Sequence, residues 1–186
     1  MGTRKKTEFN IGGNSMKEGW MLPTEVFQWL HEHIPAGSSI LEFGSGNGST
    51  ELSKKYDLIS VEHDLNWLGI SSGTYIHAEI VQNQISNKFS ELGWYDFEKL
   101  ANLPPRVDVI IIDGPPGEIG RSGLLGFLSK LPLFTWMIVD DTDRLNEKHL
   151  SIELIRRLSP IKTIEITSKI NRHNGAPRKA MVLLMR

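Results

Sequence analysis

The sequence of 186 residues contains no cysteine. This absence excludes disulfide bonds, thiolate metal sites and a cysteine nucleophile. Long apolar runs are missing as well, since no stretch approaches the roughly 20 apolar residues of a transmembrane helix. Residues 1–10 carry basic side chains without an apolar segment behind them, so neither a secretory signal nor a membrane anchor is indicated. We therefore expect a soluble, cytoplasmic protein without a membrane partner.

An excess of charge of one sign is also absent. The chain has 21 Lys and Arg against 22 Asp and Glu, which gives a formal net charge of −1. Such a chain has no global attraction to nucleic acid, and we do not expect nucleic acid as a partner. The one basic concentration, NRHNGAPRK at 171–179, is interpreted as a solvated hairpin tip because it lacks interleaved aromatic residues, although it would also suit an anionic substrate or RNA.

The length fits one domain of ordinary size. We expect residues 24–186 to form this single domain and residues 1–23 to be an N-terminal tail. The glycines at 12 and 13 would also let the tail close over a binding site as a lid. The sequence does not separate these two options, and it leaves open whether the chain forms a homodimer.

Short apolar runs alternate with helical or loop segments, a pattern typical of an α/β domain with a mainly parallel sheet. Some runs are almost continuously apolar, as expected of strands that helices cover on both faces. The polar stretch 168–178 has no helical period, so we expect the last two strands to form an antiparallel hairpin. Seven strands are predicted: Ser39–Phe43, Leu58–Glu62, Tyr75–Val81, Val107–Asp113, Trp136–Asp140, Thr163–Thr167 and Lys179–Met185.

Two helices have clear signals in the sequence. Apolar residues spaced for one buried face predict a helix over Thr24–Ile34, with Thr24 as its N-cap. A second apolar stripe predicts a helix over Leu145–Leu158, and Pro160 follows it as a stop.

A glycine-rich turn follows the first predicted strand, in the stretch ILEFGSGNGST. Without a Cβ, Gly44 and Gly46 can take tight or positive-φ turn geometry and let a ligand lie against the backbone, and Gly48 would let the next helix sit close to the sheet. Glu62 ends the following strand, twenty residues after Glu42. A Rossmann-type site needs a carboxylate there to bind the ribose hydroxyls. The order of elements therefore predicts a ribose-containing cofactor.

The pattern E-x-G-x-G-x-G at 42–48 resembles motif I of the class I S-adenosylmethionine-dependent methyltransferases. Dinucleotide sites usually place the third glycine one residue later. The resemblance spans about residues 24–186 and implies a Rossmann-like, seven-stranded, mostly parallel sheet with helices on both faces and an antiparallel C-terminal hairpin. It also implies S-adenosylmethionine as the cofactor, bound by Glu42, Gly44, Ser45, Gly46, Gly48, Glu62, His63, Tyr95, Asp96 and Asp113.

Within this set, the resemblance assigns Tyr95 and Asp96 to the adenine ring. Trp94 and Tyr95 are interpreted equally well as ordinary packing aromatics.

Carboxylates close two of the predicted apolar strands, Asp113 at the end of one and Asp140 with Asp141 at the end of the next. Ligands of open α/β sheets lie beyond the carboxyl ends of the strands, so we expect these carboxylates to face the transferred methyl group. In one interpretation the three aspartates bind Mg²⁺, whose preferred ligands are oxygens. The arrangement resembles the metal site of the catechol and caffeoyl-CoA O-methyltransferases, but the loop after Asp113 has no lysine that would serve as a base.

Two other interpretations of these carboxylates are open. In one, Asp113 binds the ammonium group of the cofactor, and an ion pair forms from Asp141 or Asp143 with Arg144 or Arg121. In the other, residues 140–143 simply cap the next helix, where the helix dipole favours carboxylates.

Methyl transfer to a hydroxyl or a protonated amine requires a base. The candidate bases are Asp113, Asp141, His63, His77 and His173. We also expect Arg121 to act in catalysis as the anchor of an anionic substrate group, with an ordinary surface charge as the alternative.

The predicted function is S-adenosylmethionine-dependent methylation of a small molecule, with metal-assisted O-methylation as one form of it. An NAD-dependent oxidoreductase and a non-catalytic cofactor-binding module are the alternatives on the same type of fold.

Overall fold

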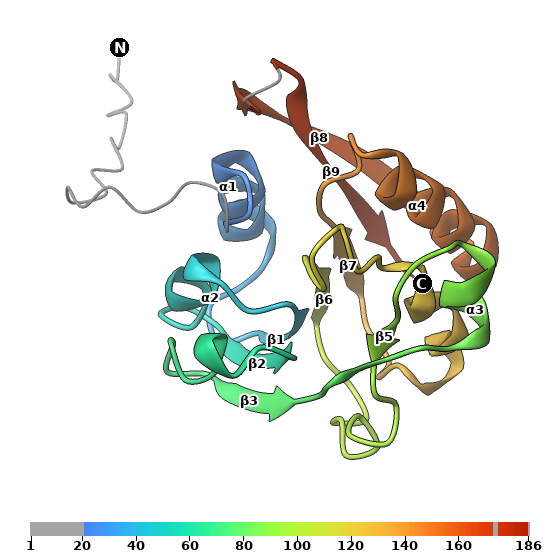
Figure 1. The fold of residues 1–186 in the computed structure, drawn as a ribbon. Helices are drawn as coiled ribbons and strands as arrows, with labels where there is room; N and C mark the ends of the chain where they lie inside the picture. The colour runs from blue at the N-terminus through green and yellow to red at the C-terminus, as the bar shows by residue number, and fades with distance from the viewer. Residues whose placement is uncertain (1–20, 173–174, 186) are drawn as a thin grey trace, which may run out of the picture.

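The computed structural model describes residues 21–172 and 175–185 (Figure 1). Its centre is a seven-stranded sheet in the order β3-β2-β1-β6-β7-β9-β8. Neighbouring strands are parallel from β3 to β7, and the last two pairs are antiparallel. The predicted fold class, including the C-terminal hairpin, is confirmed. The strands are β1 (Ser39–Phe43), β2 (Asp57–Glu62), β3 (Thr74–His77), β6 (Val109–Ile112), β7 (Trp136–Val139), β8 (Lys162–Asn171) and β9 (Pro177–Leu184).

The third predicted strand, Tyr75–Val81, is wrong as a single strand. The sheet pairing of β3 stops at His77, which lies opposite Glu62, the last residue of β2. Beyond that point the neighbouring strand has ended, and the chain leaves the sheet. Strand β4 (Ile80–Val81) instead pairs with β5 (Trp94–Tyr95) in a separate two-stranded sheet.

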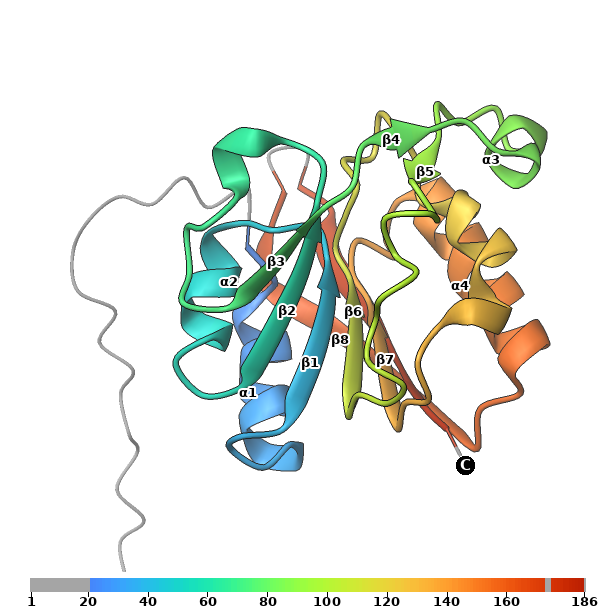
Figure 2. The ribbon, with the colours of Figure 1, turned by 90° about the horizontal axis from the view of Figure 1, so that it is seen from below.

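Helices cover both faces of the sheet, and Figure 2 shows α1 and α2 on one side and α4 on the other. The central strands contribute side chains to the apolar cores on both faces of the sheet. In β6, Val109 and Ile111 pack in the core beneath α1 and α2, whereas Ile110 and Ile112 pack in the core beneath α4. All four side chains are fully buried, which explains their continuous apolar sequence. The α-helices are α1 (Thr24–His33), α2 (Asn47–Leu52), α3 (Gln84–Lys88) and α4 (Leu145–Leu158).

Helices α1 and α4 are the two helices whose ends were predicted from the sequence. Helix α4 has the predicted bounds. Its C-cap is Ser159, which has a left-handed backbone and directly precedes Pro160. Helix α1 begins at Thr24, but the prediction of Thr24 as its N-cap is wrong. Pro23 holds the N-cap position, and its carbonyl accepts the first backbone bond of the helix from Val26.

Within the described ranges, no helix is both long and apolar enough to cross a bilayer. The predicted tail or lid at 1–23 lies outside the described residues except for 21–23, and so does the candidate base His173.

Candidate functional site

The carboxyl ends of β1, β2, β6 and β7 lead into loops that enclose a cavity of about 510 Å³, which we name the first cavity. Six of the ten predicted cofactor residues line it: Gly44, Ser45, Gly46, Glu62, His63 and Asp113. The predicted catalytic residues Asp113, Asp141 and Arg121 line it too. The sheet therefore brings most of the predicted site together at one edge, as expected of an open α/β sheet.

The glycine turn is shaped by a close approach between two loops. Gly44 has a φ of +94°, and a Cβ there would lie only 2.5 Å from the backbone nitrogen of Gly114. Only glycine fits this contact and this conformation. Gly46 is extended, with φ −165°, so the positive φ that was expected applies to Gly44 alone. Gly48 lies outside the first cavity, where a Cβ would lie 3.3 Å from the Phe27 ring of α1.

Glu42 supports the turn from beneath and does not line the first cavity. Its side chain is 2% exposed, and its Oε2 accepts hydrogen bonds from the hydroxyls of Ser49 at 2.7 Å and Ser60 at 2.8 Å. The Ser49 hydroxyl in turn accepts from the Gly46 backbone at 3.0 Å. Burial raises the pKa of the Glu42 carboxyl to about 7, although the two serine hydrogen bonds oppose this. Glu42 thus acts on the turn through Ser49.

Glu62 lines the first cavity with an anchored carboxylate. Its Oε2 accepts from the Ser45 backbone at 2.7 Å, and its Oε1 accepts from the backbones of His63 at 2.7 Å and Asp64 at 2.8 Å. A carboxylate has about four acceptor positions, so these three bonds leave one for a ligand. The fixed carboxylate beside a bare glycine turn fits the ribose of an adenosyl cofactor.

Tyr95 and Asp96, which were expected to frame adenine, are not among the residues that line the first cavity. Trp94 and Tyr95 are fully buried, and the Tyr95 ring packs 5.9 Å from that of Phe43, so these aromatics belong to the core. Trp67 lines the cavity instead, and its carbonyl accepts from the Ser45 hydroxyl at 3.1 Å. The sequence reasoning missed Trp67, although an aromatic residue five positions after the strand-ending glutamate was a usable signal.

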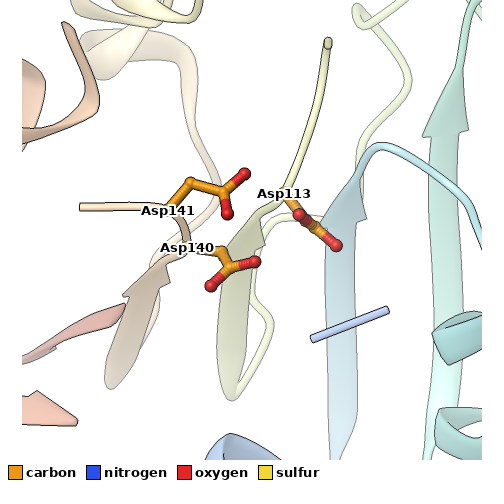
Figure 3. Close-up of side chains that lie close together, drawn as sticks. All are labelled: Asp113, Asp140 and Asp141. Carbon is orange, nitrogen blue, oxygen red and sulfur yellow. The ribbon is translucent and has the colours of Figure 1, made fainter. Parts of the chain in front are cut away.

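The predicted carboxylate cluster forms at the ends of β6 and β7 (Figure 3). Oxygens of Asp113, Asp140 and Asp141 lie within 4.8 Å of one another. Burial raises the pKa of Asp140 to about 6, and the charge of Asp141 adds to this. Burial also raises the pKa of Asp113 well above its usual range. Asp141 has a φ of +61°, a left-handed backbone that is uncommon outside glycine and that clusters at functional sites.

Arginines surround this cluster. Asp141 Oδ2 lies 3.0 Å from Arg144 and 3.3 Å from Arg121, which confirms the pairing proposed for Asp141. Burial acts to raise the pKa of Asp141, but Arg121 and Arg144 hold it below its usual value. Asp141 Oδ1 accepts a hydrogen bond from Arg172. Asp143, the alternative partner in the sequence reasoning, pairs with Arg172 at 2.7 Å.

The residues around the carboxylates do not fit Mg²⁺. Arg178 donates to Asp140 Oδ2 at 2.7 Å, and the oxygens of Asp141 face guanidinium groups on both sides. A divalent cation would have to lie among these positive charges, which oppose its binding. The helix-cap interpretation is wrong, because Arg144 holds the N-cap position of α4 without a side-chain capping bond.

Arg121 is built into the scaffold beneath the first cavity, with 3% of its side chain exposed. A guanidinium has five N–H donors. Within the described residues these donate to four backbone carbonyls and one carboxylate, those of Pro115, Ile112, Asp140, Asp113 and Asp141. A substrate anion would have to displace one of these acceptors. Arg144, which was expected to pair with the aspartates, and Arg178 of the basic 171–179 stretch line it too.

The two described candidate histidines are neighbours. His63 lines the first cavity, and its Nδ1 lies 2.7 Å from Glu62 Oε1. His77 lies behind it, with Nε2 3.1 Å from the His63 carbonyl oxygen. His63 is therefore the histidine that a ligand in the first cavity reaches.

No family model and no curated protein matches the sequence. Solved structures do have a similar fold. The C-terminal domain of precorrin-6Y C5,15-methyltransferase from Rhodobacter capsulatus is 16% identical, with a TM-score of 0.52 over 83% of each chain. An rRNA methylase from Streptococcus thermophilus is 13% identical, with a TM-score of 0.52 over 87% of this chain and 95% of that one.

The O-methyltransferase TomG from Streptomyces achromogenes, solved in complex with S-adenosylmethionine, is 13% identical, with a TM-score of 0.52 over 87% of this chain and 79% of that one. These likenesses establish the fold. The chain has the Rossmann-like fold of these methyltransferases, with the predicted glycine turn at the carboxyl edge of its sheet.

Proposed function

We propose that this chain binds S-adenosylmethionine in the first cavity and transfers its methyl group to a small-molecule acceptor. The observation that carries the proposal is the bare turn at Gly44 and Gly46 beside the anchored Glu62 carboxylate. Such a turn lets a ligand lie against the backbone, and the carboxylate accepts a hydrogen bond from a ribose hydroxyl. The similar fold of three methyltransferases supports the proposal.

The residues at the edge of the sheet then have distinct tasks. We assign the Trp67 ring to the adenine side of the first cavity. Among the described residues that line this cavity, Trp67 is the one tryptophan. We assign Asp113 to the ammonium group of the cofactor, since a cation there favours the ionised form of a carboxyl whose pKa burial raises. The cofactor, when bound, supplies an electrophilic methyl group. Holding the acceptor in line with that group is worth up to about 7 to 11 kcal/mol.

The small-molecule acceptor is proposed from charge and not from the fold. Proteins described as an rRNA methylase and as an O-methyltransferase have similar folds, so the fold does not choose between acceptors. A net charge of −1 disfavours a nucleic acid acceptor. Arg144 and Arg178 line the first cavity and would attract an anionic group. Assistance by Mg²⁺, as in the catechol and caffeoyl-CoA O-methyltransferases, is not part of the proposal because arginines occupy the carboxylates.

Calorimetric titration with S-adenosylhomocysteine tests the proposal. We expect saturable binding to the unmodified chain and none of NAD⁺, the cofactor of the alternative oxidoreductase. Glu62→Gln should weaken binding by at least about tenfold, because a hydrogen bond to a charged group contributes about 1.5 to 3 kcal/mol. Glu51→Gln, an exposed change on α2, is the matched control and should leave the affinity unchanged.

A loss of folding in Glu62→Gln would also weaken cofactor binding. Glu62 also holds three backbone N–H groups, so thermal unfolding of Glu62→Gln must show a folded protein, and Glu62→Asp provides a second variant that keeps the charge. Binding of NAD⁺ in place of S-adenosylhomocysteine would favour the oxidoreductase. Equal affinity in the unmodified chain and both variants would remove Glu62 from the site.

A further inference from the structure

A second cavity, of about 440 Å³, adjoins the first between the loop after β6 and the start of α4. It shares Gly117, Glu118 and Arg144 with the first cavity, so the two are neighbours along one groove. Its remaining lining residues are Leu145, Asn146 and Glu147. Leu145, Asn146 and Glu147 do not line the first cavity.

Glu147 is the residue that points to a ligand in the second cavity. Its side chain is only 2% exposed, and its Oε1 accepts no hydrogen bond from any described residue. The nearest cation, Arg121 Nε, lies 3.9 Å away, beyond hydrogen-bond distance. The helix dipole explains a carboxylate in the first turn of α4, but it does not explain a buried oxygen without a donor. Such an oxygen lining a cavity is suited to receive a donor from a bound molecule.

Gly117 lines both cavities and lies close to Arg144 and Glu147. A Cβ at this position would lie 2.8 Å from Arg144 Nη1 and 3.5 Å from Glu147 Oε1. The cation and the carboxylate therefore face the same small space from two sides. A molecule placed there would meet a hydrogen-bond donor of Arg144 and the empty acceptor of Glu147 together.

The two carboxylates that the sequence offered as bases, Asp113 and Asp141, already have other partners or tasks. Asp141 is held by guanidinium groups, which lower its pKa and occupy its oxygens. Burial raises the pKa of Asp113 well above its usual range, and the proposed function already assigns its carboxylate to the ammonium group of the cofactor. Glu147 Oε1 accepts no hydrogen bond from the described residues, and Arg121 Nε lies 3.9 Å away from it.

We propose that the second cavity binds the methyl acceptor, a small hydroxylated carboxylate, and that Glu147 is the general base for its hydroxyl group. This inference rests on the proposed function. The acceptor carboxylate binds Arg144, whose side chain is 40% exposed. Arg144 is paired with Asp141, and Asp141 also pairs with three other arginines of the described chain. The apolar part of the acceptor packs on Leu145, which is 67% exposed.

The methyl transfer needs only the acceptor hydroxyl, the cofactor and Glu147. As the new carbon–oxygen bond forms between the methyl group and the acceptor oxygen, the acceptor O–H bond breaks. The proton passes to Glu147 Oε1. The electron pair of the broken carbon–sulfur bond stays on sulfur, which leaves S-adenosylhomocysteine and the methyl ether of the acceptor.

Two probes that differ by one methyl group test this assignment. 3-Hydroxybenzoate carries a carboxylate and a hydroxyl, whereas 3-methoxybenzoate carries a methyl group in place of the hydroxyl proton. Each is titrated into the ¹⁵N-labelled protein with and without saturating S-adenosylhomocysteine, and amide shifts are followed by NMR. We expect 3-hydroxybenzoate to shift the amides of Gly117, Glu118 and Glu147 and to bind at least about tenfold more tightly than 3-methoxybenzoate.

Glu147→Gln should remove this preference, because an amide oxygen cannot take the proton and accepts a weaker hydrogen bond. The affinity of this variant for S-adenosylhomocysteine should not change. A general loss of structure would weaken that affinity too, so the titration separates the two causes. Glu153→Gln, on the outer face of the same helix, is the matched control and should behave as the unmodified chain. Mass spectrometry should detect 3-methoxybenzoate formed by the unmodified chain and by Glu153→Gln, with at least about a hundredfold less from Glu147→Gln.

Equal affinity for the two probes, shifts confined to other surfaces, or unchanged turnover in Glu147→Gln would each overturn the assignment. Failure of S-adenosylhomocysteine to bind would instead overturn the proposed function. The titration without that cofactor still reports whether the second cavity recognises a hydroxylated carboxylate, so the two failures are distinguishable.

Discussion

The buried carboxyl of Glu42 should make the stability of the protein fall as pH rises. Its pKa is raised to about 7 because it lies beneath the glycine turn with only hydroxyl donors, those of Ser49 and Ser60, as partners. In the unfolded chain the ordinary value of 4.5 applies. We predict that Glu42→Gln, which keeps the shape and the acceptor oxygen, abolishes this contribution to the pH dependence.

The sign and size follow from linkage between protonation and folding. A pKa that is higher in the folded protein gives stability that is complete below pH 4.5 and is lost as pH rises through about 7. The full difference corresponds to about 3 kcal/mol, undiminished by solvent because the side chain is almost fully buried. Between about pH 5 and pH 8, about 2 to 3 kcal/mol of it should be lost.

Urea unfolding of both proteins at these two pH values measures the effect. The difference in unfolding free energy between Glu42→Gln and the unmodified chain should grow in favour of the variant by about 2 to 3 kcal/mol from the lower to the higher pH. Asp113 and Asp140 also have raised pKa values. They are present in both proteins and cancel in the difference, except for the contribution of the Glu42 charge to the Asp113 pKa, which is weaker than those of burial and of the other charges. Glu51→Gln, an exposed change, should show no such growth.

A difference that stays constant over this pH range would refute the reasoning, because it would mean that Glu42 is ionised at both values. A difference that grows in the opposite direction would mean that the folded protein favours the charged form.

Two further predictions concern the framework of the site. Gly44→Ala should cost at least about 2 kcal/mol more than Gly37→Ala in urea unfolding, because both positions have a positive φ but only Gly44 meets backbone within 3 Å, and equal costs would contradict the close approach. Arg121→Lys should cost about 3 kcal/mol or more, since a lysine cannot reproduce the fork that holds four carbonyls, whereas the exposed Arg156→Lys should cost less than about 0.5 kcal/mol; similar values for the two would show that Arg121 is not a structural centre.

Sequence reasoning succeeded where the determinants are local. The strand Ser39–Phe43, the turn at Gly44 and the glutamate that ends the next strand all lie within residues 39–62. Their order alone places them at one edge of the sheet. The acidic residues at the ends of β6 and β7 were also expected to meet, because the carboxyl ends of parallel strands share an edge.

The rest depends on contacts between distant segments. Arg172 and Arg178 reach the carboxylates only because the β8–β9 hairpin folds back beside β7, and the register of that hairpin is not written in either strand alone. The alternating pattern of Tyr75–Val81 continues past the end of β2, so it does not mark where the sheet stops. Glu147 has the ordinary place of a carboxylate in a first helical turn, and only its burial distinguishes it.

The most direct test of the central claim is a crystal structure of the protein with S-adenosylhomocysteine. We predict electron density for the ligand in the first cavity, with a ribose hydroxyl within hydrogen-bond distance of the Glu62 carboxylate and the adenosyl chain against the turn at Gly44 and Gly46. Ligand density at another place on the protein, with Glu62 and the glycine turn free of contact, would contradict the account.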